Sequence, residues 1–320
     1  MHPAVFMGSP EFALPSLRAL ASHSACRITG VFTQPDRPFG RGRKARPSPV
    51  RAEAEALDLP VFTPERIGGE EGLALLTEAA PEIVIVCAYG QIFPERVLSL
   101  PPGGAYNLHF SLLPRWRGAS PVQAAILAGD RETGVSMQRI VRELDAGPIV
   151  VESTPLPISA QDTAQSLGER LAEASGRLLA SALPLLLEGN PPLREQEPSL
   201  VTHCRTIPKA AGAVDWQVES ARMIERKIRA YTPWPGCFTY LGGRRLGLVR
   251  LELAGAPDQV AAGGEPPGTL LPGGLVRSQA GYVRLLEVKP EGRGAMPLQA
   301  FLNGAPDALG RILSARPEGG

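Results

Sequence analysis

An apolar run at residues 82–88, EIVIVCA, constrains the fold of this chain most strongly. A strand that is apolar at nearly every position must be covered on both faces, which is typical of a central strand in a parallel sheet. Further strand-like runs lie at residues 4–8, 27–33, 105–110, 135–141 and 148–151. Helical spacing of apolar side chains occurs at residues 10–20, 73–80, 121–128 and 161–187. This alternation predicts an α/β fold built on a doubly wound, mostly parallel sheet.

The pattern changes after the last long helical stretch. Residues 188–192, EGNPP, end the helical pattern, and the polar stretch that follows is typical of a linker. One helical segment at 221–231 then precedes short strand-like runs at residues 237–241, 246–253, 269–271, 275–278 and 282–288. Short strands with turn signals predict a small β-barrel. We therefore expect an α/β domain over residues 1–188, a linker over 189–205 and a barrel domain over 206–320.

Bulk composition excludes several classes of protein. The chain is 43% hydrophobic and 20% charged, so it can bury a core and is not a disordered polyelectrolyte. Its formal net charge is +1, so nucleic-acid contacts would have to come from local basic clusters. The four cysteines form no CxxC pair, which favours reduced thiols over a zinc site. Neither a signal peptide nor an apolar run of about 18 residues occurs, so we expect a cytoplasmic protein with no membrane partner.

The motif Asn-Leu-His at residues 107–109 is the first candidate for chemistry. Residues two apart on a strand point to one side, so Asn107 and His109 should face the same way at the carboxyl end of their strand. Ligands in open α/β sheets bind at that edge. An amide donor beside an imidazole suits a carbonyl oxygen that becomes an oxyanion, whereas a lone histidine is more often a satisfied core residue.

Asp145 is the second candidate, because it lies in a turn before a strand, in the sequence ELDAGP. A carboxylate there could orient a histidine ring and stabilise its cation. The alternative is an aspartate that only forms the turn. The sequence does not show whether Asp145 and His109 meet.

A basic segment at residues 36–51 is the third candidate. It carries six Lys or Arg residues against one acid, and two glycines among them favour a flexible loop. Long basic side chains on such a loop suit phosphate contacts. The alternative is an ordinary solvated loop. Residues 206–320 hold fourteen basic and ten acidic residues, a weaker indication of a second RNA-contacting surface.

These motifs resemble a known family. Asn107, His109 and Asp145, with SLLPRWRGASP at residues 111–121, are similar to the active-site signature of the 10-formyltetrahydrofolate-dependent formyltransferases. GSPEFALPSLRAL near the start, QPDRPFGRGRKARPSP and TPWPG at 232–236 resemble the branch of that family that acts on methionyl-tRNA. The resemblance covers essentially the whole chain. It implies a Rossmann-like formyltransferase domain followed by an OB-like barrel that binds tRNA.

The resemblance also implies the reaction. A neutral methionine amine on initiator tRNA would attack the formyl carbon of 10-formyltetrahydrofolate. Asn107 and His109 would donate hydrogen bonds to the oxyanion, and Asp145 would hold His109 and help move the proton through water. No metal, covalent enzyme intermediate or obligate protein partner is implied.

Binding residues follow from the same resemblance. The folate site carries over onto Ser111, Leu112, Leu113 and Pro114, with Ala88, Tyr89 and Gly90 lining the pterin pocket. The tRNA-binding loop carries over onto Arg37, Arg41, Arg43, Lys44 and Arg46. Cys87 and Gln91 depart from the family, which usually has a small residue at the first position and an apolar one at the second.

The sequence leaves other functions open. A formyltransferase for a nucleotide-linked amino sugar would share the trio and the SLLP loop, but would not need the basic segment. A glycinamide ribonucleotide formyltransferase needs only the first domain. A tRNA-binding protein without catalysis would not need the trio, and a dehydrogenase is disfavoured because the GSP turn lacks a GxGxxG pattern.

Overall fold

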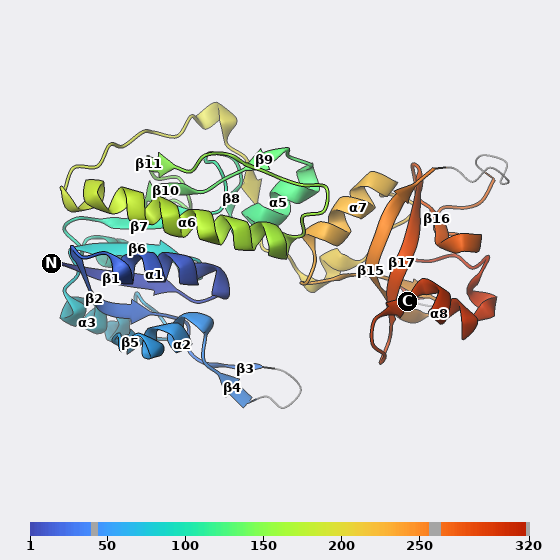
Figure 1. Ribbon diagram of the computed structural model, residues 1–320, viewed down its shortest axis with the longest axis horizontal. Coiled ribbons are helices and arrows are strands. Elements are labelled where there is room, and N and C mark those ends of the chain that lie inside the picture. Colours follow the sequence, from blue (N-terminus) through green and yellow to red (C-terminus); the bar gives the residue numbers. More distant parts are fainter. Residues whose placement is uncertain (40–43, 256–263, 318–320) are drawn as a thin grey trace. The chain divides into compact units, whose positions relative to one another are not determined.

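The computed structural model describes residues 1–39, 44–255 and 264–317 (Figure 1). Its internal contacts divide the chain into two units. The first contains residues 1–121, 131–157 and 167–205, and the second contains residues 122–130, 158–166 and the chain from 206 onward.

The first unit is built on a seven-stranded sheet with strand order β11-β10-β7-β6-β1-β2-β5. Its strands are β1 (His2–Gly8), β2 (Cys26–Phe32), β5 (Val61–Phe62), β6 (Ile83–Cys87), β7 (Ala105–His109), β10 (Ser136–Arg139) and β11 (Ile149–Glu152). The five strands from β5 to β7 run parallel, and β10 and β11 are added antiparallel beyond β7. The predicted mostly parallel sheet is confirmed. All five residues of β6 are buried, as the apolar run requires.

Helices cover both faces of this sheet. They are η1 (Glu11–Ala13), α1 (Leu14–Ser22), α2 (Pro49–Ala56), α3 (Glu70–Ala79), α4 (Glu95–Leu98) and α6 (Ala164–Leu187). Helices α1 and α6 lie side by side (Figure 1), where the buried hydroxyls of Ser16 and Ser175 are 2.8 Å apart. On the other face, Leu76 of α3 packs in one cluster with Val5 of β1 and Val84 of β6. Two covered faces explain why the central strands are continuously apolar.

The expected loop at 36–51 has more regular structure than the sequence indicated. Strands β3 (Arg37–Phe39) and β4 (Lys44–Arg46) form an antiparallel pair. Helix α2 begins at Pro49, and Ser48 caps it by accepting a hydrogen bond from the backbone N–H of Arg51. A serine before a proline at the first helical position is a helix-start signal that the basic composition had masked. Arg51 pairs with Asp36 and Glu55, so it stabilises the base of this region.

Short elements connect the end of the sheet to the following segment. They are β8 (Arg117–Gly118), α5 (Pro121–Ala128), β9 (Glu132–Thr133), β12 (Leu156–Pro157), η2 (Pro198–Leu200) and β13 (His203–Cys204). Strand β13 runs parallel to β8 and hydrogen-bonds to it. The segment at 189–205 therefore contains residues that are paired to the first unit.

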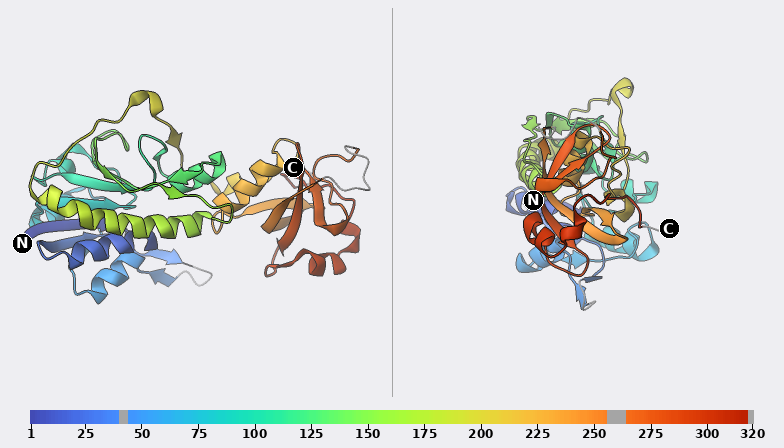
Figure 2. Two further views of the ribbon diagram at one scale, coloured as in Figure 1. Left: turned by 45° about the horizontal axis from the view of Figure 1, so that its top comes forward. Right: turned by 90° about the vertical axis from the view of Figure 1, so that its right-hand side faces the viewer.

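The second unit contains a curled antiparallel sheet (Figure 2). Its elements are η3 (Lys209–Gly212), α7 (Ala221–Ala230), β14 (Cys237–Leu241), β15 (Arg244–Ala254), η4 (Pro272–Gly274), β16 (Leu275–Arg277), β17 (Tyr282–Pro290), β18 (Met296–Pro297), α8 (Leu298–Asn303) and η5 (Pro306–Ala308). The strand order is β14-β15-β17-β16, with β18 on β17. The strand expected at 269–271 forms only isolated bridges, from Thr269 to Ile312 and from Leu270 to Val276. Trp216 is buried in the core of this unit, where its indole N–H donates a 3.0 Å hydrogen bond to the Thr239 hydroxyl.

Candidate active site

Asn107, His109 and Asp145 come together at the carboxyl edge of the sheet. Asn107 and His109 lie on β7, where they pair with Gln138 and Ser136 of β10. The chain then turns after β10 and returns as β11, and this turn carries Asp145 back over the end of β7. The strand period explains why the asparagine and histidine share a side, and the turn supplies the carboxylate that the sequence could not place.

The Asp145 carboxylate accepts hydrogen bonds from three N–H groups. Its Oδ1 accepts from the Gln138 amide at 2.8 Å and from the Asn107 amide at 3.4 Å. Its Oδ2 accepts from the backbone N–H of Gly118 at 2.8 Å. The side chain is 9% exposed. Donors aimed at both oxygens fix the carboxylate beside the histidine.

The His109 ring is held from both sides. Its Nε2 lies 2.9 Å from the carbonyl oxygen of Trp116, and its Nδ1 lies 3.6 Å from Asp145 Oδ1. Because a carbonyl only accepts, Nε2 carries the proton in the neutral ring, which leaves Nδ1 as the basic nitrogen. A proton taken up at Nδ1 would turn the contact with Asp145 into a charge-assisted interaction.

The SLLP loop is fixed from beneath by Ser136 of β10. The buried Ser136 hydroxyl donates to the carbonyl oxygen of Ser111 at 2.9 Å and accepts from the N–H of Leu113 at 2.9 Å. Ser111 donates its own hydroxyl proton to the carbonyl oxygen of Arg115 at 2.6 Å. Ser111, Leu113 and Pro114 are buried and Leu112 is half-buried. A ligand at this loop would therefore meet mainly its backbone.

The segment that follows β6 has two exposed, left-handed positions. Ala88 has φ 52° and Gly90 has φ 81°, and both are exposed. The Tyr89 ring is instead buried in the apolar core, where it packs against Phe93, and this burial raises the pKa of its hydroxyl. The Tyr89 carbonyl oxygen accepts from the Gln34 amide at 3.0 Å. Tyr89 could thus reach a ligand only through its backbone, and its predicted role stays a prediction.

The predicted tRNA-binding residues are placed only in part. Arg37 lies on β3, Lys44 lies on β4, and Arg46 ends β4 with an exposed side chain. Arg41 and Arg43 lie outside the described residues.

Sequence reasoning missed Ser136, Gln138 and Gly118. Ser136 and Gln138 alternate with the apolar residues of β10, although both are buried. Buried polar residues at a period of two are unusual in a covered strand, and this pattern marks a polar face beneath the site. Gly118 contributes only its N–H, for which no side-chain signal exists.

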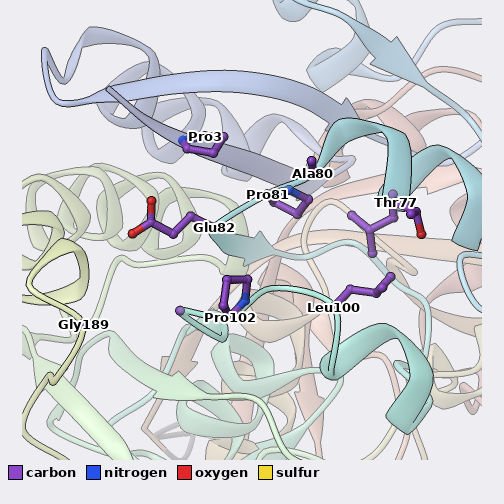
Figure 3. A pocket seen from close by; sticks show the side chains of 10 residues that line it. Pro3, Thr77, Ala80, Pro81, Glu82, Leu100, Pro102 and Gly189 are labelled. Atoms are coloured by element: carbon purple, nitrogen blue, oxygen red, sulfur yellow. The ribbon is translucent and has the colours of Figure 1, made fainter.

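A hollow lies away from these residues. It has a volume of about 710 Å³ and opens at the amino edge of the sheet, among Pro3, Pro81, Glu82, Leu100 and Pro102 (Figure 3). These residues lie at the beginnings of β1, β6 and β7, opposite the ends that carry the trio. We take the polar convergence as the candidate site, because a hollow alone supplies no catalytic group.

Among residues 1–39, 44–255 and 264–317, no cluster of three or more His, Cys, Asp or Glu side chains is arranged to hold a metal ion. No helix in the described part of the chain has the length and apolar character needed to span a membrane.

The fold is of the α/β class, and an amide, an imidazole and a carboxylate meet at the carboxyl edge of its sheet. The sequence profile described as "Formyl transferase" matches residues 1–183, and the one described as "Formyl transferase, C-terminal domain" matches residues 206–306. The chain therefore belongs to the formyl transferase family.

Curated relatives agree with this membership. The methionyl-tRNA formyltransferase of Methylococcus capsulatus is 43% identical over 305 residues, which are 93% of this chain and 96% of that protein. The methionyl-tRNA formyltransferase of Paracoccus denitrificans is 40% identical over 307 residues, covering 95% of this chain and 99% of that protein.

Solved structures share the fold at low sequence identity. An N-formyltransferase from Helicobacter canadensis, in complex with folinic acid and dTDP-3-aminofucose, has a TM-score of 0.63 and 15% identity, covering 89% of this chain and 99% of that one. HypX from Aquifex aeolicus, in complex with tetrahydrofolic acid, has a TM-score of 0.58 and 17% identity over 96% of this chain. This chain spans about half of HypX, 48% of its length.

Proposed function

We propose that this protein transfers the formyl group of 10-formyltetrahydrofolate to the α-amino group of methionyl initiator tRNA. The observation that carries the proposal is the meeting of Asn107, His109 and Asp145 at the carboxyl edge, in a chain whose relatives over nearly full length are named methionyl-tRNA formyltransferases. The product would be formylmethionyl-tRNA for translation initiation. Because tRNA is charged in the cytoplasm, we propose that location for the reaction.

Catalysis begins with the attack of the neutral amine on the formyl carbon. The attack forms a carbon–nitrogen bond and places negative charge on the formyl oxygen. The Asn107 amide and the Nδ1–H of a protonated His109 ring are the donors we assign to that oxyanion, because Nε2 already contacts the Trp116 carbonyl, whereas Nδ1 lies 3.6 Å from Asp145, beyond hydrogen-bonding distance. Each oxyanion donor contributes roughly 3–4 kcal/mol to the transition state.

Completion of the reaction requires a proton to move. The attacking amine loses a proton and the folate nitrogen gains one as its bond to the formyl carbon breaks. His109 Nδ1 and Asp145 lie together at 3.6 Å and form the pair we assign to this transfer, with water as a relay. Asp145 also keeps the ring oriented, because its own oxygens are held by Gln138 and Gly118.

The folate would lie along the ends of β6 and β7. These strands are hydrogen-bonded neighbours, so the segment after β6 and the SLLP loop after β7 leave the sheet at the same edge. Ala88, Tyr89 and Gly90 would offer backbone groups to the pterin ring, and residues 111–114 would hold the formyl-bearing end. Two observations support this assignment: Ala88 and Gly90 are exposed, and the 111–114 loop is fixed by its hydrogen bond to Ser136.

Domain roles extend the proposal. Residues 1–188 would form the catalytic domain, 189–205 the linker, and 206–320 an OB-like barrel that binds tRNA. The two profile matches, at 1–183 and 206–306, support these boundaries, and the curled antiparallel sheet supports the barrel. Arg37, Arg41, Arg43, Lys44 and Arg46 would contact the acceptor end of the tRNA, since their charges suit phosphates.

The test is formyl transfer from 10-formyltetrahydrofolate to methionyl initiator tRNA, measured beside a UDP-linked amino sugar as acceptor. Transfer to the tRNA alone is expected. Transfer to the sugar alone would keep the trio but overturn the role of the basic segment. The absence of transfer to either acceptor would contradict the proposed function.

A further inference from the structure

The segment at 189–205, expected only to link two domains, reaches the catalytic groups. Gln196 lies in it and is 7% exposed, which is unusual for a glutamine between two domains. Two residues earlier, the backbone of Arg194 both donates to and accepts from the backbone of Ile149 in β11, with N···O distances of 2.9 and 2.8 Å. The bridge places Gln196 beside the turn that carries Asp145.

The hydrogen bonds of the Gln196 side chain all go to residues that surround Asp145 or to the backbone of its turn. Its Nε2 donates to the carbonyl oxygens of Asp145 and Gly147, at 2.9 and 2.7 Å. The same nitrogen lies 3.4 Å from Gln138 Oε1. Its Oε1 accepts from Nε of the buried Arg117 at 2.9 Å. One side chain thus joins the Asp145 turn, the strand beneath it and the loop across from it.

The orientation of this amide is set by its partners. Arg117 only donates, and the carbonyls of Asp145 and Gly147 only accept. A flipped Gln196 amide would place N–H against N–H and oxygen against oxygen. The two N–H groups must therefore point at the turn.

The turn needs external support. Asp145 has φ 51°, a left-handed conformation that side chains larger than glycine adopt at a cost. Gly147 approaches Arg139 so closely that an added Cβ would lie 1.7 Å from the Arg139 carbonyl oxygen. Two hydrogen bonds from Gln196 to the carbonyls at 145 and 147 hold this strained turn to the 189–205 segment.

The same segment also supports the other side of His109. Thr202 accepts a hydrogen bond from Trp116 N–H through its hydroxyl, at 2.9 Å, and from Arg117 N–H through its carbonyl, also at 2.9 Å. Trp116 is the residue whose carbonyl contacts His109. Both partners of the histidine are therefore held by residues of the 189–205 segment.

We propose that Gln196 is a positioning residue for Asp145, acting through the backbone of the 145–147 turn. The inference rests on the proposed function, because it assigns catalytic work to the group that Gln196 holds. Without the two donated hydrogen bonds, the turn would sample other conformations and the Asp145 carboxylate would leave His109 for part of the time. None of the Gln196 side-chain hydrogen bonds goes to residues 88–90 or 111–114, the segments proposed to bind folate, so donor binding should be preserved.

Two variants separate the donating and accepting roles of Gln196. Gln196→Met keeps the approximate volume and removes every hydrogen bond. Gln196→Glu keeps an acceptor for Arg117 but cannot donate to either carbonyl when ionised. The matched control is Glu197→Gln, because Glu197 is exposed and its hydrogen-bond partner, Ser199, lies outside the site.

Steady-state formyl transfer and hydrogen–deuterium exchange would be measured on the full-length variants. Gln196→Met and Gln196→Glu should each lower kcat about 10- to 100-fold, leave the KM for 10-formyltetrahydrofolate within about 2-fold, and speed exchange at residues 143–147. Glu197→Gln should match the wild type. A Gln196→Glu variant with wild-type kcat and exchange would overturn the inference. Exchange tests the positioning even if the wild type transfers no formyl group, an outcome that would refute only the proposed function.

Discussion

The two edges of the parallel sheet differ in what they offer a ligand. The amino edge has a hollow of about 710 Å³ lined mostly by apolar residues, among them Pro3, Leu76 and Pro81. The carboxyl edge brings an amide, an imidazole and a carboxylate within hydrogen-bonding or ion-pair range of one another. The proposed catalytic groups instead lie at the strand ends where loops of different strands converge, so the proposal rests on polar convergence and not on the volume of a hollow.

The largest test of this contrast is removal of the donors at the carboxyl edge. His109→Ala and Asn107→Ala should each lower kcat by roughly 10²–10³-fold, because each removes a donor to the oxyanion. The matched change at the amino edge is Glu82→Gln, which removes the charge of the partner that His2 contacts at 2.8 Å. That variant should keep the wild-type kcat. Full turnover in either carboxyl-edge variant would remove that residue from the mechanism.

Asp145→Asn tests the charge at the carboxyl edge while keeping the shape of the side chain. An amide can still accept through one oxygen, but its NH₂ group would face either the Gly118 N–H or the Gln138 amide, each of which now donates to a carboxylate oxygen. We expect kcat to fall by about 10²-fold, since both proton transfer and support of the His109 cation are weakened. Single-turnover rates would separate this loss from slow product release. A variant with unchanged single-turnover rates would show that the carboxylate charge is not used.

The amino edge should matter for stability. Leu76 lines the hollow and is fully buried in the cluster beneath α3. Leu76→Ala should lower the free energy of unfolding by about 2 kcal/mol, the low end for such truncations, because the adjacent hollow lets the site relax. Denaturant unfolding would give this value, and kcat at a temperature well below the transition should be unchanged. A large loss of kcat in the folded variant would show that the two edges are coupled.

Local patterns in the sequence predicted the sheet and the shared side of Asn107 and His109, whereas only the family resemblance joined Asp145 to them. The apolar run at 82–88 identified the central strand, and the two-residue period placed Asn107 and His109 together. No local pattern predicted that Gln196 contacts the Asp145 turn. It lies 51 residues from Asp145 along the chain, in a stretch that resembles an ordinary linker. The start of α2 was hidden for a different reason. The cap at Ser48 was present, but the surrounding basic residues favoured a loop. Local periodicity thus predicts strands well, while hydrogen bonds between distant segments require the fold.

A smaller effect concerns the ionisation of a buried thiol at the carboxyl end of β6. Cys87 ends β6, and complete burial raises the pKa of its thiol to about 12 from an ordinary value of 9.0. The folded pKa exceeds the unfolded one, so the stabilising contribution is complete below pH 9 and is lost as pH rises toward 12. In that window the slope is at most about 1.4 kcal/mol per pH unit from this one group. Cys87→Ala should flatten the fall in unfolding free energy between pH 9 and 11. Cys237 of β14, whose pKa burial also raises to about 12, provides the same test for the second unit. An unchanged slope in Cys87→Ala would mean that the thiol ionises as readily in the folded sheet as in the unfolded chain, and that the strand end beside the catalytic edge admits water.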